Sequence, residues 1–276
     1  MATLRAQSRP GMCLQEAAKR TGPRTSTSAM NRSTHPPRPL ASGRQRRNER
    51  CILSPDHWSE MRVDVTELPL LNRMAYDRVA QQYETRAVSD AINDVPIVAA
   101  VMSAWRSRHE GTPRLLDVGC GAGVNLRMFA NEGCVVTGID ISPEMVTIAQ
   151  ENAPAAQVLE GDVMEIERRE SFDIVFAKAF LHLYPKVDAF NVLNHLTSFL
   201  VNDGIIYIAT TAHQTPSEGF ENKSDYEGSP ARFRSRWTPG EWHELAKQAG
   251  LSIVCEWRNT DRRNNKNWMN LICTRD

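Results

Sequence analysis

A glycine-rich run in the middle of the chain has the composition of a ligand-binding loop. Residues 117–123 read Asp-Val-Gly-Cys-Gly-Ala-Gly, at the end of the strand-like run Arg114–Val118 and at the start of a helical pattern. Glycine has no Cβ, so the backbone can turn sharply there and approach a ligand closely. Ligands bind beyond the carboxyl ends of the strands in open parallel sheets. We therefore expect Gly119, Gly121 and Gly123 to border a binding site.

Acidic residues close the next two strand-like runs. Val135–Ile139 is followed by Asp140, and Gln157–Glu160 is followed by Gly161 and Asp162. A carboxylate at Asp140 can accept both hydroxyl hydrogens of a ribose, which indicates a nucleoside ligand without specifying which one. A turn at Asp140 or a helix cap at Asp162 would explain each acid alone. Together with Asp117, however, these acids lie at the ends of three successive strands, and neither a turn nor a helix cap explains that coincidence.

Alternating patterns predict the elements that position these residues. The expected strands are Arg114–Val118, Val135–Ile139, Gln157–Glu160, Phe172–Ala177 and Ile205–Thr210, and the expected helices between them lie near 123–131, 143–151 and 186–200. Helical spacing of apolar residues also runs through 71–83 and 97–105. Such alternation implies a parallel sheet that is covered by helices on both faces.

The last part of the chain has a different pattern. Thr238-Pro239-Gly240-Glu241 predicts a capping box that opens a helix, and Gly250 would close it. Two strands, Leu251–Glu256 and Trp268–Thr274, then follow and can pair as an antiparallel hairpin. The expected fold is α/β: a Rossmann-like, doubly wound, mostly parallel sheet of seven strands with an antiparallel hairpin at its C-terminal edge.

The glycine run resembles motif I of the class I methyltransferases that depend on S-adenosylmethionine (SAM). A dinucleotide-binding fingerprint that begins at Gly119 needs Gly or Ala at position 124, where this chain has Val124. The segment 76–83 is similar to the N-terminal helix that folds over the cofactor in small-molecule methyltransferases. The resemblance covers residues 70–275 and is to the type found in ubiquinone and menaquinone biosynthesis.

This resemblance implies SAM as the cofactor and assigns residues to it. Asp140 would bind the ribose, Asp162 the adenine amino group, and Val163 the adenine ring through its backbone N–H. The remaining cofactor residues would be Tyr83, Asp117, Gly119, Gly121, Gly123, Ile141, Met145 and the backbone of Lys178. No CxxC pair and no Cys/His cluster with zinc spacing occurs, so we expect no metal.

Methyl transfer from a sulfonium is a direct displacement, so the protein mainly aligns the reacting atoms. A general base is needed only where the nucleophile arrives protonated. His182, after the fourth strand, is the expected base because histidine titrates near neutral pH. A histidine on a helix surface is the plain alternative for this position. His213, just past the fifth strand, is the second candidate.

Residues 212–236 are polar and lack a clear period, which predicts a long loop that serves as a substrate lid. Its basic and aromatic residues suggest an aromatic or carboxylate-bearing substrate, with Arg234 and Arg236 raising the affinity for an anion. A solvated, charged surface loop explains the same composition. The basic and aromatic residues are Lys223, Arg232, Arg234, Arg236, Phe220, Tyr226 and Phe233.

The expected activity is methyl transfer to an oxygen or nitrogen atom of a small molecule. A peptide or protein N-methyltransferase and a non-catalytic, SAM-binding regulatory subunit are the alternatives; Val124 disfavours a reductase. Enzymes that methylate base amino groups carry an Asn/Asp-Pro-Pro-aromatic motif where this chain reads Ala177-Lys178-Ala179-Phe180. This difference, with the net acidity of residues 61–276, argues against a nucleic-acid substrate.

The first 60 residues differ in charge from the rest. Of the 33 basic and 33 acidic residues, residues 1–60 hold eleven Lys/Arg and four Asp/Glu, which leaves 22 and 29 in residues 61–276. We expect residues 1–60 to be a disordered basic leader and residues 61–276 to be the methyltransferase domain. An organelle transit peptide, a translation start assigned upstream of Met61 and a basic arm that contacts nucleic acid are three explanations of the leader.

The composition also bears on location. No apolar run approaches the roughly 20 residues that a membrane-spanning helix needs, so no membrane span is expected. Isolated cysteines are typical of a reducing compartment. The expected location is therefore the cytoplasm, or an organelle if the leader is a transit peptide.

Overall fold

The computed structural model describes residues 67–167, 171–221, 226–228, 231–261, 263 and 265–275. The expected basic leader, residues 1–60, lies outside these ranges and stays a prediction. Within the described ranges no single helix is long and apolar enough to cross a membrane. Only Leu68–Asn93 and Val95–Arg106, which meet at a bend of 61°, have the necessary length and composition as a pair.

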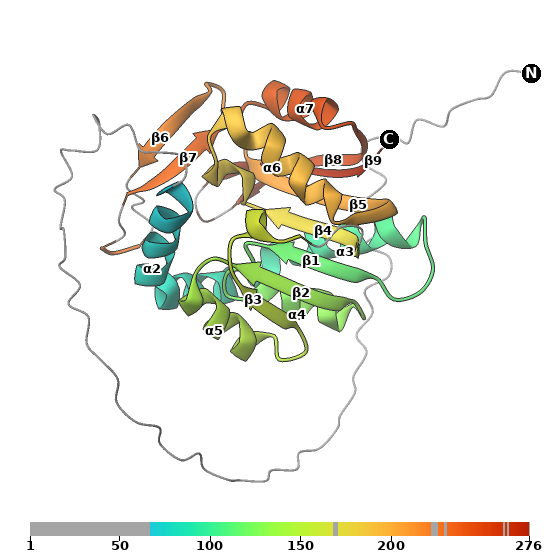
Figure 1. The fold of residues 1–276 in the computed structure, drawn as a ribbon, viewed down its shortest axis with the longest axis horizontal. Helices are drawn as coiled ribbons and strands as arrows, with labels where there is room; N and C mark the ends of the chain where they lie inside the picture. Colours follow the sequence, from blue (N-terminus) through green and yellow to red (C-terminus); the bar gives the residue numbers. More distant parts are fainter. Residues whose placement is uncertain are drawn as a thin grey trace, which may run out of the picture. The chain divides into compact units, whose positions relative to one another are not determined.

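A seven-stranded sheet in the order β3-β2-β1-β4-β5-β9-β8 forms the centre of the domain (Figure 1). Its first five strands are parallel: β1 (Arg114–Val118), β2 (Val135–Asp140), β3 (Gln157–Glu160), β4 (Phe172–Lys178) and β5 (Leu200–Thr211). The chain adds β2 and β3 on one side of β1 and then returns to add β4 on the other. This reversal places a ligand crevice at the carboxyl ends of β1 and β4.

The C-terminal hairpin is present and extends the sheet. β8 (Leu251–Asp261) pairs with β9 (Lys266–Arg275), and β9 also pairs antiparallel with β5. The last strand therefore lies inside the sheet and β8 forms its edge. The capping box is confirmed: α7 (Pro239–Gln248) begins after Thr238, whose side chain and that of Glu241 each accept the other's backbone N–H.

Helices cover both faces of the sheet (Figure 1). α3 (Val95–Arg106), α4 (Val124–Asn131) and α5 (Pro143–Asn152) pack on one face, and α6 (Lys186–Ser198) and α7 pack on the other. α2 (Leu68–Asp90) covers neither face and contacts α5 and β7. The short 3-10 turns are η3 (Ala91–Asn93), η4 (Val163–Glu165) and η5 (Leu181–Leu183). Successive strand residues alternate between two buried clusters. Leu116 and Val175 pack in the cluster that includes residues of α6 and α7, while Leu115 and Ile174 pack in the cluster that includes residues of α3 and α4. The expected α/β fold with an antiparallel C-terminal hairpin is thus confirmed.

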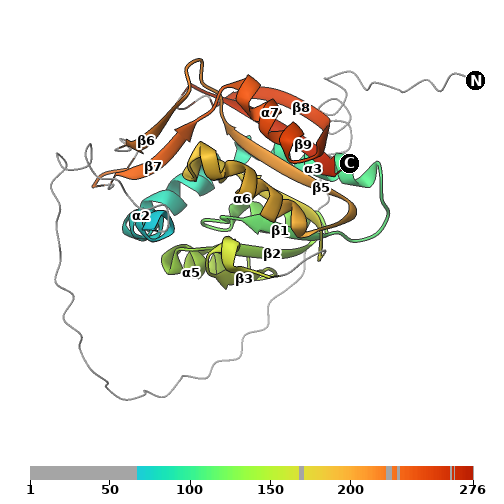
Figure 2. The same ribbon diagram turned by 45° about the horizontal axis from the view of Figure 1, so that its top comes forward.

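The segment expected as one long loop contains a second, two-stranded sheet. β6 (Ser217–Glu221) pairs antiparallel with β7 (Arg232–Arg236), so the expectation of a loop over 212–236 is wrong at these strands. The pattern was weak because only Phe233 in β7 is apolar, although arginine recurs at every second position. Figure 2 shows the β6–β7 pair beside α2, and β7 contacts both α2 and η5.

Candidate cofactor and substrate site

One cavity of about 690 Å³ lies at the carboxyl ends of β1, β2 and β4. Its lining comes from α2, the glycine loop after β1, the turn after β2, η5, β7 and the hairpin between β8 and β9. Volumes of about 300–1,000 Å³ are usual for sites that bind cofactors and other small molecules. The cavity therefore occupies the crevice that the sheet topology indicates.

The glycine loop is covered by two aromatic rings. Gly119 and Gly121 line the cavity, with φ angles of +66° and +52°. A Cβ added at Gly119 would lie 3.0 Å from Phe180 Cδ2, and one added at Gly121 would lie 3.0 Å from Tyr83 Cε1. Only glycine fits at both positions without moving a ring. Tyr83, which was expected to contact the cofactor, lies over the loop.

Gly123 has a different role from the two glycines before it. It is the N-cap of α4 and has a φ of +74°. A Cβ at this position would lie 2.8 Å from the Cα of Ala149 in α5. Gly123 is not among the described residues that line the cavity. Its glycine is therefore explained by close packing of α4 against α5.

Asp140 joins the end of β2 to the glycine loop. Its Oδ2 accepts the Gly121 N–H at 2.8 Å and its Oδ1 accepts the Ser142 N–H at 3.0 Å. Burial raises the pKa of Asp140, and hydrogen bonds from the Ser142 and Gly121 backbone oppose this rise. Because each carboxylate oxygen can accept more than one hydrogen bond, Asp140 can still bind ribose hydroxyls from its place in the cavity wall.

Asp117 presents a buried carboxylate to the cavity. The residue is only 3% exposed, and its Oδ2 has no hydrogen-bond partner among the residues that the structure describes. Burial raises the pKa of Asp117 to about 8, and the nearby Lys178 ammonium lowers it. An unpaired buried acceptor costs about 1–3 kcal/mol, so a ligand that donates a hydrogen bond here would be stabilised.

The predicted adenine residues also line the cavity. These are Ile141, Met145, Asp162 and Val163. Asp162 also accepts the Met164 N–H at 2.9 Å and caps η4, which is the structural role that its position allowed. The cap uses one carboxylate oxygen, Oδ1, and leaves the other for a ligand.

Lys178 lies at the end of β4 and lines the cavity, as expected. Its ammonium forms an ion pair with Asp94, the N-cap of α3, and lies 5.8 Å from the ring centroid of Trp268. The partly buried pair ties the end of β4 to α3. The Lys178 side chain is thus engaged with the protein, which is compatible with a backbone contact to the cofactor.

Aromatic residues of α2 continue the cavity wall beyond Tyr83. Tyr76 packs edge-on against Tyr83 with 6.0 Å between centroids, and the guanidinium carbon of Arg232 lies 4.9 Å from the Tyr76 centroid. Burial raises the pKa of Tyr83 far above its usual range. The spacing of Tyr76 and Tyr83, two helical turns apart, could have indicated a shared face. Arg232 could not be found in this way, because its burial depends on a helix far away in sequence.

Only one of the two predicted bases borders the cavity. His182, in η5, is 8% exposed and lines it. His213 is not among its described lining residues; its Nε2 lies 3.0 Å from Thr211 Oγ1. Burial lowers the pKa of His213, and Arg236 and Arg234 lower it further. The geometry therefore favours His182 over His213 as the group that contacts substrate.

In the described part of the chain, no cluster of three or more His, Cys, Asp or Glu side chains could hold a metal ion. Cys120, Cys134 and Cys273 are buried. Burial raises the pKa of Cys120 above its usual range and that of Cys134 to about 12.

The central part of the chain matches a known protein family. Residues 115–204 match the family described as "Methyltransferase domain". This segment is therefore similar to methyltransferase domains. The match begins within β1 and includes the glycine loop, Asp140, Asp162 and His182. It covers about one third of the chain, but it includes the acids at the ends of β1, β2 and β3.

Curated proteins that are similar to this chain in sequence are named as methyltransferases. Trans-aconitate 2-methyltransferase of Enterobacter sp. (strain 638) is 29% identical over 152 residues, which are 53% of this chain and 59% of that protein. The chain spans less than two thirds of the length of this and other curated relatives that it matches. About half of the chain is thus similar in sequence to proteins that are named methyltransferases.

Two crystal structures share the fold at lower identity. One is 1,6-didemethyltoxoflavin-N1-methyltransferase of Burkholderia thailandensis, with bound 1,6-didemethyltoxoflavin and S-adenosylhomocysteine (SAH). Its TM-score is 0.59 at 20% identity, and the match covers 78% of this chain and 92% of that one. The other is magnesium protoporphyrin IX methyltransferase of Synechocystis PCC 6803 with bound SAM, with a TM-score of 0.56, 18% identity and coverage of 78% and 98%. At these identities the likenesses show that the chain shares the fold of these two proteins.

Proposed function

We propose that this protein is a SAM-dependent methyltransferase that acts on an oxygen or nitrogen atom of a small molecule. The observation that carries the proposal is the convergence of Asp117, Asp140 and Asp162 with the glycine loop on one cavity. All of these residues lie within the matched methyltransferase domain. The structural neighbours that contain SAM or SAH support the same cofactor.

The residues present fit this cofactor. Asp117 Oδ2 is a buried acceptor that lacks a donor among the described residues, and an ammonium group is a suitable donor for it. Asp140 retains acceptor capacity for a pair of ribose hydroxyls. Ile141 and Met145 offer apolar contacts to a purine. When bound, SAM supplies an activated methyl group on a sulfonium.

A small-molecule substrate agrees with the size of the cavity. Its volume of about 690 Å³ is divided between a nucleoside cofactor and whatever accepts the methyl group. Residues of α2 and β7 supply walls of this cavity beyond the glycine loop. The similarity of the α2 segment 76–83 to small-molecule methyltransferases, including those of ubiquinone and menaquinone biosynthesis, supports this class.

The chain contributes mainly alignment and exclusion of water. Tyr83 and Phe180 cover the glycine loop. His182 would accept the proton of the substrate O–H or N–H as the oxygen or nitrogen forms its bond to the methyl carbon. The carbon–sulfur bond breaks in the same step and its electron pair stays on sulfur, which becomes a neutral thioether. Alignment of this kind can lower a barrier by about 7–11 kcal/mol.

Calorimetric titration of the full chain with SAH tests the cofactor assignment. Asp140→Asn should weaken SAH binding roughly 10- to 100-fold, because charge-assisted hydrogen bonds contribute about 1.5–3 kcal/mol. Glu144→Gln is the matched control, since Glu144 is an exposed acid just beyond Asp140. Binding of NAD in place of SAH would overturn the proposal.

The activity itself is tested by transfer of a labelled methyl group from SAM to a cell extract. Separation of the extract into low-molecular-weight and protein fractions shows which one accepts the label. We expect the label in the low-molecular-weight fraction. Label in protein alone would overturn the small-molecule assignment and favour a protein methyltransferase.

A further inference from the structure

Strand β7 directs part of its basic face at the cavity. Side chains alternate along a strand, so Arg232, Arg234 and Arg236 share one face while Phe233 and Ser235 occupy the other. Arg232 and Arg234 line the cavity, and Arg232 is only 2% exposed. Arg236 is exposed and is not among the described lining residues. The strand therefore delivers two of its three guanidinium groups to the site.

These two guanidinium groups have no carboxylate partner in the described part of the protein. Neither Arg232 nor Arg234 forms an ion pair there, and the Nε of each is buried without a hydrogen-bond partner. Arg232 instead lies over the ring of Tyr76. By contrast, Arg236 Nε pairs with Glu221 Oε1 at 2.8 Å. Buried charges in proteins are normally paired, so an anionic ligand could compensate the charge of these two guanidinium groups.

The two cations also affect each other. Burial lowers the pKa of Arg234, and the positive charge of Arg232 lowers it further. Tyr76 and Glu221 act in the opposite direction. The two positive charges therefore repel each other, and an anion bound by both would offset this repulsion. A guanidinium group offers a planar fork of donors that matches two oxygens of a carboxylate or phosphate.

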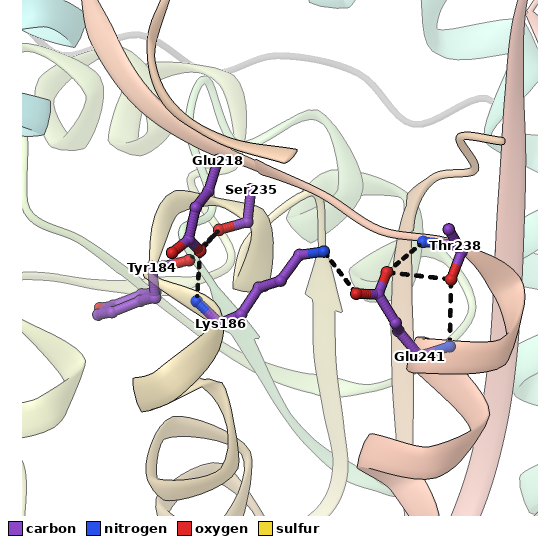
Figure 3. A network of polar contacts seen from close by, with 6 residues as sticks. All are labelled: Tyr184, Lys186, Glu218, Ser235, Thr238 and Glu241. Atoms are coloured by element: carbon purple, nitrogen blue, oxygen red, sulfur yellow. Dashed lines mark hydrogen bonds and ion pairs between the residues drawn. The ribbon is translucent and has the colours of Figure 1, made fainter. Parts of the chain in front are cut away.

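A polar network holds β7 in position (Figure 3). Ser235 Oγ donates to the Tyr184 carbonyl oxygen at 2.6 Å, which joins β7 to the chain just after η5. Glu218 of β6 accepts the Lys186 N–H at 2.9 Å, and Lys186 Nζ pairs with Glu241 at 2.7 Å. The strand that carries the arginines is thus held next to η5, which contains His182.

We propose that Arg232 and Arg234 bind an oxyanion of the methyl acceptor, a carboxylate or a phosphate, so that the enzyme acts on acidic small molecules. This inference rests on the proposed methyltransferase function. Arg234 is the more accessible of the two cavity-lining arginines, and Arg232 is the more buried, against Tyr76. The anionic group is an anchor, and the atom that receives the methyl group lies elsewhere on the same molecule, towards His182.

Thermal unfolding of the full chain with saturating SAH tests the oxyanion site. The probes are succinate and benzoate for carboxylates, glycerol 3-phosphate for phosphates, and succinamide, benzamide and glycerol as neutral counterparts. We expect at least one acid to raise the Tm while its neutral counterpart does not. A response to carboxylates alone or to the phosphate alone identifies the oxyanion. No acid-specific response from any probe would overturn the proposal.

Two variants of the same strand separate the arginines' roles. Arg234→Ala should abolish the acid-specific Tm shift and raise the KM of an acidic acceptor about 10- to 100-fold, as expected for loss of a charged hydrogen bond. Arg236→Ala, the matched control, should leave both unchanged. SAH affinity should stay within about twofold of the unmodified protein in both, far less than the tenfold change that corresponds to 1.4 kcal/mol.

Other outcomes distinguish this proposal from the proposed function. A loss of SAH affinity in Arg234→Ala, with acid binding retained, would assign the arginine to the cofactor's own carboxylate and overturn the proposal. Normal SAH binding without any acid response would leave the methyltransferase function standing and remove only the oxyanion site. Absence of SAH binding in the unmodified protein would remove the proposed function itself.

Discussion

Asp140 Oδ2 accepts the backbone N–H of Gly121 at 2.8 Å, so the acid at the end of β2 and the glycine loop after β1 form one structural unit. Tyr83 closes this unit from the side of α2, because its Cε1 lies only 3.0 Å from the position that a Gly121 Cβ would take. The end of β2, the glycine loop and α2 are therefore in contact with one another at Gly121. A change to any one of them should alter the cofactor affinity.

Gly121→Ala should weaken SAH binding about tenfold, which corresponds to about 1.4 kcal/mol. The new Cβ would displace the Tyr83 ring, and the φ of +52° adds strain. Gly133→Ala is the matched control, because Gly133 has a φ of +90° and nothing within 4 Å of an added Cβ. Both changes should lower the free energy of unfolding by about 1–2 kcal/mol. Calorimetry and urea unfolding measure the two effects, and equal SAH affinities in both variants would contradict the packing argument.

The stability of the protein should fall with rising pH because of Asp117. Its pKa of about 8 lies above the ordinary value, so the folded state binds more protons than the unfolded state between about pH 4 and pH 8. The free energy of unfolding should therefore decrease through this window and level off above it. Asp117→Asn removes the titrating group, so the variant should lose less stability than the unmodified protein across the same range.

Urea unfolding at several pH values measures this difference. Asp173→Asn is the control: burial raises the pKa of Asp173, but hydrogen bonds from Arg114 outweigh that and the net shift is downward. Its contribution to stability is thus lost below about pH 4, outside the window. Identical pH profiles for Asp117→Asn and the unmodified protein would show that Asp117 is not protonated in the folded state.

His182→Ala should lower kcat about 10²- to 10⁴-fold if this residue removes a proton from the acceptor. Imidazole added to the assay should restore part of the activity, which a purely structural role would not allow. SAH affinity should not change. His213→Ala should retain kcat, because His213 does not line the cavity among the described residues. A larger loss in His213→Ala than in His182→Ala would reverse the assignment.

The sheet and the cofactor side of the site could be predicted because their signals are local. Glycines at fixed spacing and acids at the ends of apolar runs depend on a few neighbouring residues. Strand β5 begins at Leu200, earlier than the predicted Ile205, because Leu200 pairs with Phe172 across a register shift in β4. Because this pairing depends on β4, the sequence of β5 alone does not show where the strand begins.

The substrate side of the site was less predictable. Arg232 and Arg234 had the composition of a solvated loop, and only the fold reveals that α2 covers one of them. The arginines that recur at every second residue of β7 were a strand signal, but a single Phe233 between them was too little to identify a buried strand. The same fold separates Arg234 from Arg236, which sequence alone had treated as equivalent.

The position of β9 has a consequence for the order of events during synthesis. β9 lies between β5 and β8, and the hairpin that joins it to β8 supplies Lys266 and Trp268 to the cavity wall. A nascent chain that has emerged only as far as β8 therefore has an open gap beside β5 and an incomplete pocket. The ligand-binding capacity should therefore appear only once β9 has left the ribosome and has paired with β5.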